Sequence, residues 1–168
     1  MQINVCSLSL LDTTVASTGA RQILTLLNVG TKVVRPVTVE ERMHLFLGMN
    51  DIIEMADGQI LPGEGHLSQL LRFVTAWDQK TPLVVHCYAG VSRSTAAAFT
   101  AACALNPHLD EFELAQTIRR LSPTATPNKR IVALADAYLK RDGRMIAAID
   151  TIGRGEDCFE GVPFALTL

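Results

Sequence analysis

The chain has 168 residues, of which 48% are hydrophobic and 19% are charged, and its formal net charge is −2. This length and this apolar content predict one folded domain spanning residues 1–168 and exclude a disordered chain. The near-neutral charge argues against a general affinity for nucleic acid or for acidic membranes.

The sequence contains neither an apolar run long enough to span a membrane nor a basic, then apolar, secretory signal. Its four cysteines lie far apart, which fits a reducing compartment better than a disulfide framework. They are Cys6, Cys87, Cys103 and Cys158. These features predict a cytoplasmic protein that binds neither a membrane nor a nucleic acid.

Short apolar runs, punctuated by glycine and proline, alternate with helical patterns along the chain. Strands are expected at 3–6 (as an edge strand), 22–27, 43–47 and 83–85. Helices are expected at 10–17, 66–79, 94–106, 111–121, 128–139 and 145–152. The remaining segment, 153–168, is expected to form a surface tail. This order predicts an α/β domain with a mainly parallel central sheet flanked by helices.

The most informative segment reads Leu-Val-Val-His-Cys-Tyr-Ala-Gly-Val-Ser-Arg-Ser-Thr, at positions 83–95. A buried strand here meets the start of an alanine-rich helix, where unpaired N–H groups and the helix dipole attract anions. Gly90 gives the loop backbone freedom, and the guanidinium of Arg93 can donate to two oxygens of one phosphate. Such a field favours a thiolate, which predicts that Cys87 is a nucleophile facing a bound phosphate.

Ser94 follows the arginine, and its hydroxyl is placed to donate to the sulfur and stabilise it as a leaving group. A nucleotide-binding loop is disfavoured because no Gly-Lys-Ser/Thr sequence is present. A zinc site is disfavoured because the sequence lacks Cys-x-x-Cys and spaced histidine pairs. We therefore expect phosphate chemistry on a cysteine, with no metal and no other cofactor.

The pattern His-Cys, five residues, Arg-Ser resembles the signature loop of the cysteine-dependent protein tyrosine phosphatase superfamily, and Ala-Gly-Val-Ser-Arg-Ser resembles its dual-specificity branch. The resemblance implies a phosphatase-like three-layer domain. It implies hydrolysis of phosphotyrosine, and also of phosphoserine or phosphothreonine, in proteins through a phosphocysteine intermediate. It also implies that the loop holds the phosphate through Tyr88, Ala89, Gly90, Val91, Ser92 and Arg93.

The leaving group needs a proton and the attacking water must later lose one, so a carboxyl group is expected opposite the nucleophile. In the resembled family an aspartate from a preceding loop does both. Asp51 lies 36 residues before Cys87 and Asp57 lies 30 before it. Spacing slightly favours Asp57. Context favours Asp51, because it follows the predicted strand 43–47 and because Asp57 begins an Asp-Gly turn pair. We expect Asp51 to be the acid, with Asp57 as the alternative.

Two further residues are expected to support the loop. His86 matches the histidine that the family places before its nucleophile, which implies that it hydrogen-bonds the loop and tunes the thiolate. Asn128 follows Pro127 and resembles an element that relatives place behind the signature loop to brace its backbone. A plain helix cap is the alternative for Asn128.

Other functions fit the same loop. The chemistry could act on a phosphoinositide, a sugar phosphate or an RNA 5′-phosphate, but residues 88–92 include no lysine, which disfavours a highly charged substrate. A phosphate-binding module without turnover is disfavoured because Cys87 and Arg93 are both present. The expected partner is therefore a phosphorylated protein or another phosphate ester.

Overall fold

A computed structural model describes residues 1–167 of the chain. Within these residues a five-stranded sheet runs in the order β3-β2-β4-β1-β5. Its strands are β1 (Gln2–Ser7), β2 (Gln22–Leu27), β3 (His44–Gly48), β4 (Leu83–Cys87) and β5 (Phe164–Thr167). The helices are α1 (Leu11–Thr18), η1 (Glu41–Met43, 3-10), α2 (Glu64–Thr75), α3 (Arg93–Leu105), α4 (Glu111–Leu121), α5 (Lys129–Leu139) and α6 (Arg144–Ile152).

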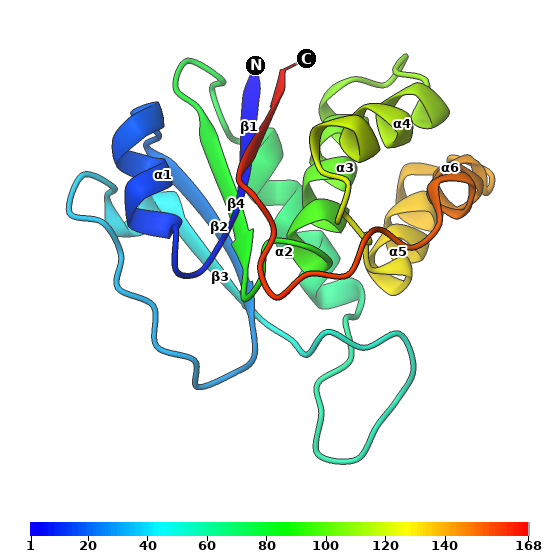
Figure 1. The fold of residues 1–168 in the computed structure, drawn as a ribbon, viewed down its shortest axis with the longest axis horizontal. Coiled ribbons are helices and arrows are strands. Elements are labelled where there is room, and N and C mark those ends of the chain that lie inside the picture. The colour runs from blue at the N-terminus through cyan, green and yellow to red at the C-terminus, as the bar shows by residue number, and fades with distance from the viewer. Residues whose placement is uncertain (168) are drawn as a thin grey trace.

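The helices cover the two faces of the sheet unequally. Helix α1 lies on one face, and α2 to α6 lie on the other (Figure 1). Strand β4 pairs in parallel with β1 and with β2, and β3 is parallel to β2. The predicted α/β class with a mainly parallel sheet is confirmed. None of the helices in residues 1–167 has the length and hydrophobicity needed to cross a bilayer.

Two predictions were wrong, and both concern the chain's last segment. Residues 153–163 are mostly exposed and pass over the loop after β4, but residues 164–167 form β5, so the expected surface tail does not extend through this strand (Figure 1). Strand β5 pairs antiparallel with β1, so β1 is not an edge strand. Leu166 is fully buried, as a tail residue would not be. Leu168 lies outside the described residues.

Helix α3 is the centre of the larger core. Five of its six alanines are fully buried, and their small side chains let the sheet and the neighbouring helices approach this helix closely. They are Ala96, Ala97, Ala98, Ala101 and Ala102. Trp77, after the end of α2, packs in the same core, and its indole N–H donates to the Thr81 carbonyl at 2.9 Å.

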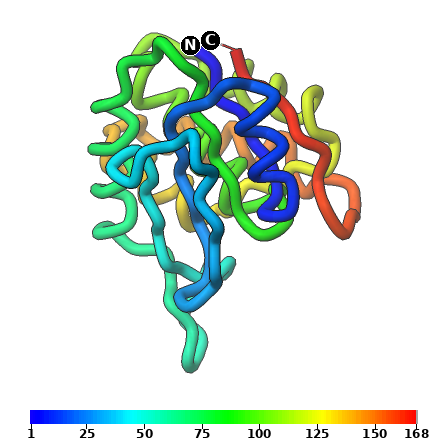
Figure 2. The backbone as a smooth tube through the Cα atoms, turned by 90° about the vertical axis from the view of Figure 1, so that its left-hand side faces the viewer, coloured from blue at the N-terminus to red at the C-terminus, as the bar shows by residue number. Residues whose placement is uncertain are grey.

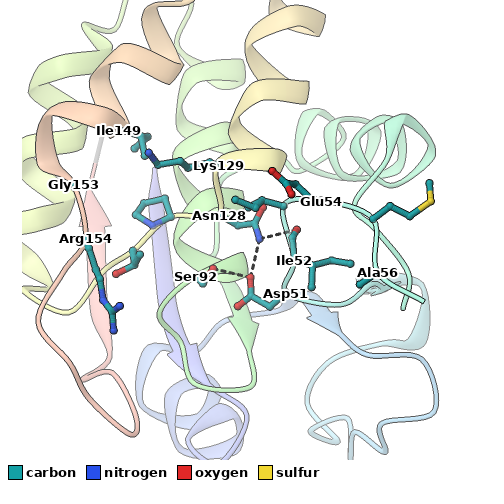
Figure 3. Close-up of a pocket in the computed structure, with 14 residues that line it drawn as sticks. Asp51, Ile52, Glu54, Ala56, Ser92, Asn128, Lys129, Ile149, Gly153 and Arg154 are labelled. Carbon is teal, nitrogen blue, oxygen red and sulfur yellow. Dashed lines mark hydrogen bonds between the residues drawn. The ribbon is translucent and has the colours of Figure 1, made fainter. Parts of the chain in front are cut away.

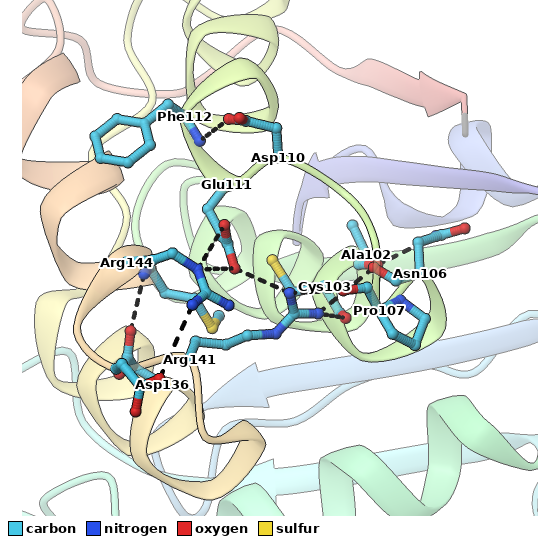
Figure 4. A network of polar contacts seen from close by, with 12 residues as sticks. Ala102, Cys103, Asn106, Pro107, Asp110, Glu111, Phe112, Asp136, Arg141 and Arg144 are labelled. Carbon is cyan, nitrogen blue, oxygen red and sulfur yellow. Dashed lines mark hydrogen bonds and ion pairs between the residues drawn. The ribbon is translucent and has the colours of Figure 1, made fainter.

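The far end of α3 is anchored by a buried arginine (Figure 4). Arg141 donates to the carbonyls of Cys103 (2.7 Å) and Pro107 (2.9 Å) and to Glu111 Oε1 (2.9 Å). Arg144 shares the same carboxylate at 3.3 Å. The last carbonyls of a helix have no intrahelical partner, so this contact satisfies them and fixes the axis of α3. The opposite end of α3 faces the loop that follows β4.

A long loop between β3 and α2 protrudes from the body of the molecule (Figures 1 and 2). It begins directly after the carboxyl end of β3, and β4 ends at the same edge of the parallel sheet. Ligands of open α/β sheets bind outside this edge. The long loop and the loop after β4 therefore share the place where a site is expected.

Candidate active site

The loop after β4 forms a small bowl around the predicted nucleophile. Strand β4 ends at Cys87 and α3 begins at Arg93, and the residues between them line a hollow of about 380 Å³. The whole Cys87 residue is 2% exposed, and its Sγ lies 3.1 Å from the hydroxyl oxygen of Ser94. The structure thus brings together the cysteine and the serine that the sequence analysis paired.

The loop is pressed against the end of β1. Gly90 has a φ of +75°, and a Cβ at this position would lie 2.8 Å from the Cys6 carbonyl carbon and 2.9 Å from the Ser7 nitrogen. The Leu8 N–H donates to the Tyr88 carbonyl at 3.1 Å. Only glycine meets both the backbone conformation and the lack of space, so this residue sets the shape of the bowl.

Arg93 is held from behind and left open on one side. The residue is 5% exposed, and its Nη1 donates to Asn28 Oδ1 (2.9 Å) and to the Met49 carbonyl (2.7 Å). Its Nε is buried without a hydrogen-bond partner among the described residues. The nearest carboxylate oxygen, Asp51 Oδ2, is 3.8 Å away, which is too far for a hydrogen bond. Burying an N–H donor without a hydrogen-bond partner costs free energy, so this N–H group is suited to donate to an oxygen of a bound ligand.

The two candidate acids lie in different places. Asp51 lines the bowl, and its Oδ1 accepts hydrogen bonds from Ser92 Oγ (2.7 Å) and Asn128 Nδ2 (2.8 Å) (Figure 3). Asp57 is exposed farther along the protruding loop and sits in a turn closed by the Gln59 N–H. The structure therefore brings Asp51, and not Asp57, to the predicted nucleophile.

His86 is fully buried behind the bowl. Its Nε2 lies 2.6 Å from Thr25 Oγ1, which in turn lies 2.7 Å from Nε2 of the partly buried His44. Burial lowers the pKa of His86 to about 4, so its imidazole is neutral at neutral pH. Burial, and then the charge of Arg35, also lower the pKa of His44. Thr25 was not expected at the site from the sequence, where its only signal is a polar residue in an otherwise apolar stretch of strand.

Asn128 lies at the start of α5, next to the loop after β4. Its Oδ1 accepts from the backbone N–H groups of Arg130 and Ile131, each at 3.1 Å, and so caps α5. Its own backbone N–H donates to the Ser92 carbonyl at 3.3 Å. Asn128 is thus a helix cap that also contacts the loop after β4.

A larger hollow, of about 950 Å³, lies beside the bowl (Figure 3). It shares Asp51 and Ser92 with the bowl. Most of its wall is apolar, and it runs between the protruding loop, the start of α5 and the end of α6. Its two cationic side chains already have carboxylate partners: Lys129 pairs with Asp150 at 2.7 Å, and Arg154 contacts Asp157.

Residues 153–163, which we call the strap, form a wall of the bowl that the sequence analysis did not foresee. The Gly161 N–H donates to the Ala89 carbonyl at 2.9 Å, and the Gly155 N–H donates to Thr126 Oγ1 at 3.0 Å. Arg119 holds the start of the strap by donating to the Gly153 carbonyl at 2.9 Å. Cys158, on the strap, lines the bowl.

Two further cysteines, Cys6 and Cys103, are buried in the core of the domain. Burial raises the pKa of Cys6 to about 11 and that of Cys103 to about 12, so both thiols stay protonated at neutral pH. All four cysteines are free. Within residues 1–167, no cluster of three or more His, Cys, Asp or Glu side chains could hold a metal ion.

Comparisons with known proteins identify a family model and several solved structures that this chain is similar to. The family model described as protein-tyrosine phosphatase matches residues 57–127, a segment that includes the bowl but begins after Asp51. No curated protein matches the chain. Among solved structures, PTP-2 phosphatase of Cydia pomonella is 18% identical with a TM-score of 0.62, covering 80% of this chain and 84% of that one.

Two further solved structures share the fold. Human DUSP28 is 17% identical, with a TM-score of 0.63, and the match covers 83% of this chain and 92% of that one. PTPMT1 in complex with PI(5)P is 14% identical, with a TM-score of 0.62, and the match covers 83% of this chain and 90% of that one. These similarities confirm the expected phosphatase-like architecture.

Proposed function

We propose that this chain is a member of the cysteine-dependent protein tyrosine phosphatase superfamily, and that residues 1–168 form one catalytic domain that hydrolyses phosphate monoesters on proteins. Its substrates are phosphotyrosine and also phosphoserine or phosphothreonine side chains. The observation that carries the proposal is the buried Arg93 guanidinium beside Cys87 and Ser94, fixed through Nη1 and, among residues 1–167, without a hydrogen-bond partner at Nε.

In the first step the Cys87 thiolate attacks phosphorus. A P–S bond forms, the P–O bond to the substrate breaks, and Asp51 gives its proton to the departing oxygen. Arg93 and the N–H groups of the loop stabilise the charge that develops on the other phosphate oxygens. Asp51 suits this role because its carboxyl lines the bowl.

In the second step water attacks phosphorus and releases inorganic phosphate. Asp51, now a carboxylate, takes the proton of this water, and the P–S bond breaks. The hydroxyl of Ser94, 3.1 Å from the sulfur, donates a hydrogen bond to the departing thiolate. The enzyme thus returns to its starting state without a separate base.

The surface around the bowl supports a polypeptide substrate. Exposed apolar side chains that can pack against a peptide lie in both hollows: Tyr88, which lines the bowl, is 64% exposed, and Met55, which lines the larger hollow beside it, is 86% exposed. Lys129 and Arg154 in the larger hollow are already paired with carboxylates, and residues 88–92 include no lysine. These residues therefore offer little unpaired positive charge to bind a polyanionic lipid. Because PTPMT1, which shares the fold, was solved in complex with PI(5)P, a phosphoinositide is the alternative substrate to test.

Replacing the nucleophile tests the chemistry. Cys87→Ser should lower kcat for 4-nitrophenyl phosphate more than about a thousandfold, because a serine hydroxyl in this bowl is a far weaker nucleophile. Binding of a phosphotyrosine peptide, followed by calorimetry, should remain. Cys158→Ser is the matched control, since Cys158 lines the same hollow. Turnover by Cys87→Ser, or its loss in Cys158→Ser alone, would contradict the mechanism.

The substrate class is tested by comparing kcat/KM. The panel contains phosphotyrosine, phosphoserine and phosphothreonine peptides, vesicles with phosphoinositides, and a sugar phosphate. We expect the phosphotyrosine peptide to give the highest value. A higher value on phosphoinositide vesicles would overturn the protein substrate while leaving the cysteine chemistry in place.

A further inference from the structure

Two helix-capping residues converge on one oxygen of Asp51. Ser92 is the N-cap residue of α3 and Asn128 is the N-cap residue of α5. Both donate to Asp51 Oδ1, at 2.7 Å and 2.8 Å (Figure 3). The cap residues of α3, which borders the bowl, and of α5, which borders the larger hollow, therefore both hold the proposed acid.

The hydroxyl of Ser92 does not cap its own helix. A serine at the N-cap position ordinarily accepts a hydrogen bond from an N–H group of the first turn. Here the Ser92 side chain makes no capping bond in the described part of the chain, and it donates to Asp51 instead. The first-turn N–H groups of α3 thus stay available to an anion in the bowl.

The amide of Asn128 can present only its nitrogen to Asp51. Its Oδ1 accepts from the N–H groups of Arg130 and Ile131, so this end of the amide must be the oxygen. The Nδ2 group then points to Asp51 and donates. The backbone N–H of Asn128 also donates to the Ser92 carbonyl, which fixes the two donors relative to each other.

These contacts distinguish the two oxygens of Asp51. An oxygen that accepts hydrogen bonds from two donors does not itself carry the carboxyl proton. The transferable proton is therefore left to Oδ2, which lies at an ion-pair distance of 3.8 Å from Arg93 Nε at the edge of the phosphate bowl.

We propose that Ser92 and Asn128 form a clamp that orients Asp51 so that Oδ2 faces the oxygen of the leaving group. Both are positioning residues, because they act on the reaction through Asp51. The inference rests on the proposed function, in which Asp51 is the general acid. It predicts that losing the clamp lowers kcat/KM most for substrates whose leaving groups depart poorly as anions, because these depend most on protonation by Asp51.

The first experiment compares kcat/KM for phenyl phosphate, a poor leaving group, and 4-nitrophenyl phosphate, a good one. Ser92→Ala should lower the value roughly tenfold for phenyl phosphate, the size expected for one lost hydrogen bond to a charged group, and by less than about threefold for 4-nitrophenyl phosphate. Ser92→Thr keeps the hydroxyl and should bring kcat/KM for both substrates back close to the native values. The control is Ser17→Ala, on α1 and outside the bowl, which should leave kcat/KM unchanged for both substrates.

The second experiment separates the clamp from the helix cap. Asn128→Asp keeps an acceptor for the first N–H groups of α5 but places a carboxylate against Asp51. The melting temperature should stay close to that of the native chain, while kcat/KM for phenyl phosphate falls at least roughly tenfold.

A double-mutant cycle decides between the outcomes. Asp51→Asn should lower kcat/KM for phenyl phosphate about a hundredfold or more, Asp57→Asn should not, and Ser92→Ala should add no further loss to Asp51→Asn. An equal loss for both substrates in Ser92→Ala, or a further loss in the double variant, would overturn the clamp alone. A normal Asp51→Asn enzyme would overturn the proposed acid and the clamp together.

Discussion

The imidazole of His86 is held neutral by its surroundings. It is fully buried, and its Nε2 shares the Thr25 hydroxyl with Nε2 of His44. The Thr25 hydroxyl has one proton and can donate to only one of the two imidazole groups. For both contacts to be hydrogen bonds, the other imidazole must donate its N–H to Thr25 Oγ1. The hydrogen bonds from His86 through Thr25 to His44 fix the ring next to Cys87 without adding a charge beneath the phosphate bowl.

The lowered pKa of His86 predicts how stability depends on pH. In the unfolded state the pKa of His86 is 6.5, so the unfolded chain binds a proton below this pH. The folded chain binds that proton only below about pH 4. The free energy of unfolding therefore falls as the pH is lowered through this window, with about 2 kcal/mol of the loss between pH 7 and pH 5 due to this group. His86→Asn should remove this part, measured by urea denaturation at both pH values.

The matched control for this measurement is His108→Asn, at an exposed position. It should keep the full loss of stability between pH 7 and pH 5. If His86→Asn shows the same loss as the native chain, the buried histidine is not the group responsible.

At the scale of elements, the contact between β1 and the loop after β4 shapes the site. Gly90→Ala would place a methyl group within 3 Å of the Cys6 and Ser7 backbone in a left-handed conformation. We expect the free energy of unfolding to fall by about 3 kcal/mol and kcat for 4-nitrophenyl phosphate to fall more than tenfold, because the loop must move. Gly58→Ala, also at positive φ (+71°) but in open space, should cost about 1 kcal/mol and leave kcat near the native value.

How well each element could be predicted from the sequence depends on how local its causes are. Helix α4 begins and ends where expected, because Asp110 caps it and its apolar spacing is regular. Strand β5 was missed, because its four residues carry a weak pattern and their partner strand lies at the opposite end of the chain.

The residues of the candidate site also differ in how well they could be predicted from the sequence. Cys87, Arg93 and Ser94 lie in one continuous motif and could be placed together from the sequence. Thr25 and the strap could not, because they reach the site only through the order of the strands and the path of the chain after α6.

At the scale of the whole molecule, the chain returns to its first strand after crossing the bowl. Leu166 on β5 is fully buried against the larger core, whereas Val162, just before β5, is 78% exposed. Leu166→Ala should lower the free energy of unfolding by about 3 kcal/mol, and Val162→Ala by less than about 0.5 kcal/mol, measured by urea denaturation. Equal effects of the two substitutions would mean that β5 adds little to the stability of the sheet.

Trp77 is the single tryptophan of the chain, and it lies in the core near the start of β4, whereas the bowl lies past the end of that strand. Its indole is shielded from water and tied to the Thr81 carbonyl. Its fluorescence should therefore shift to longer wavelength only when the core opens, and not when a phosphate ester binds. This gives the molecule a built-in optical signal for unfolding that stays separate from catalysis.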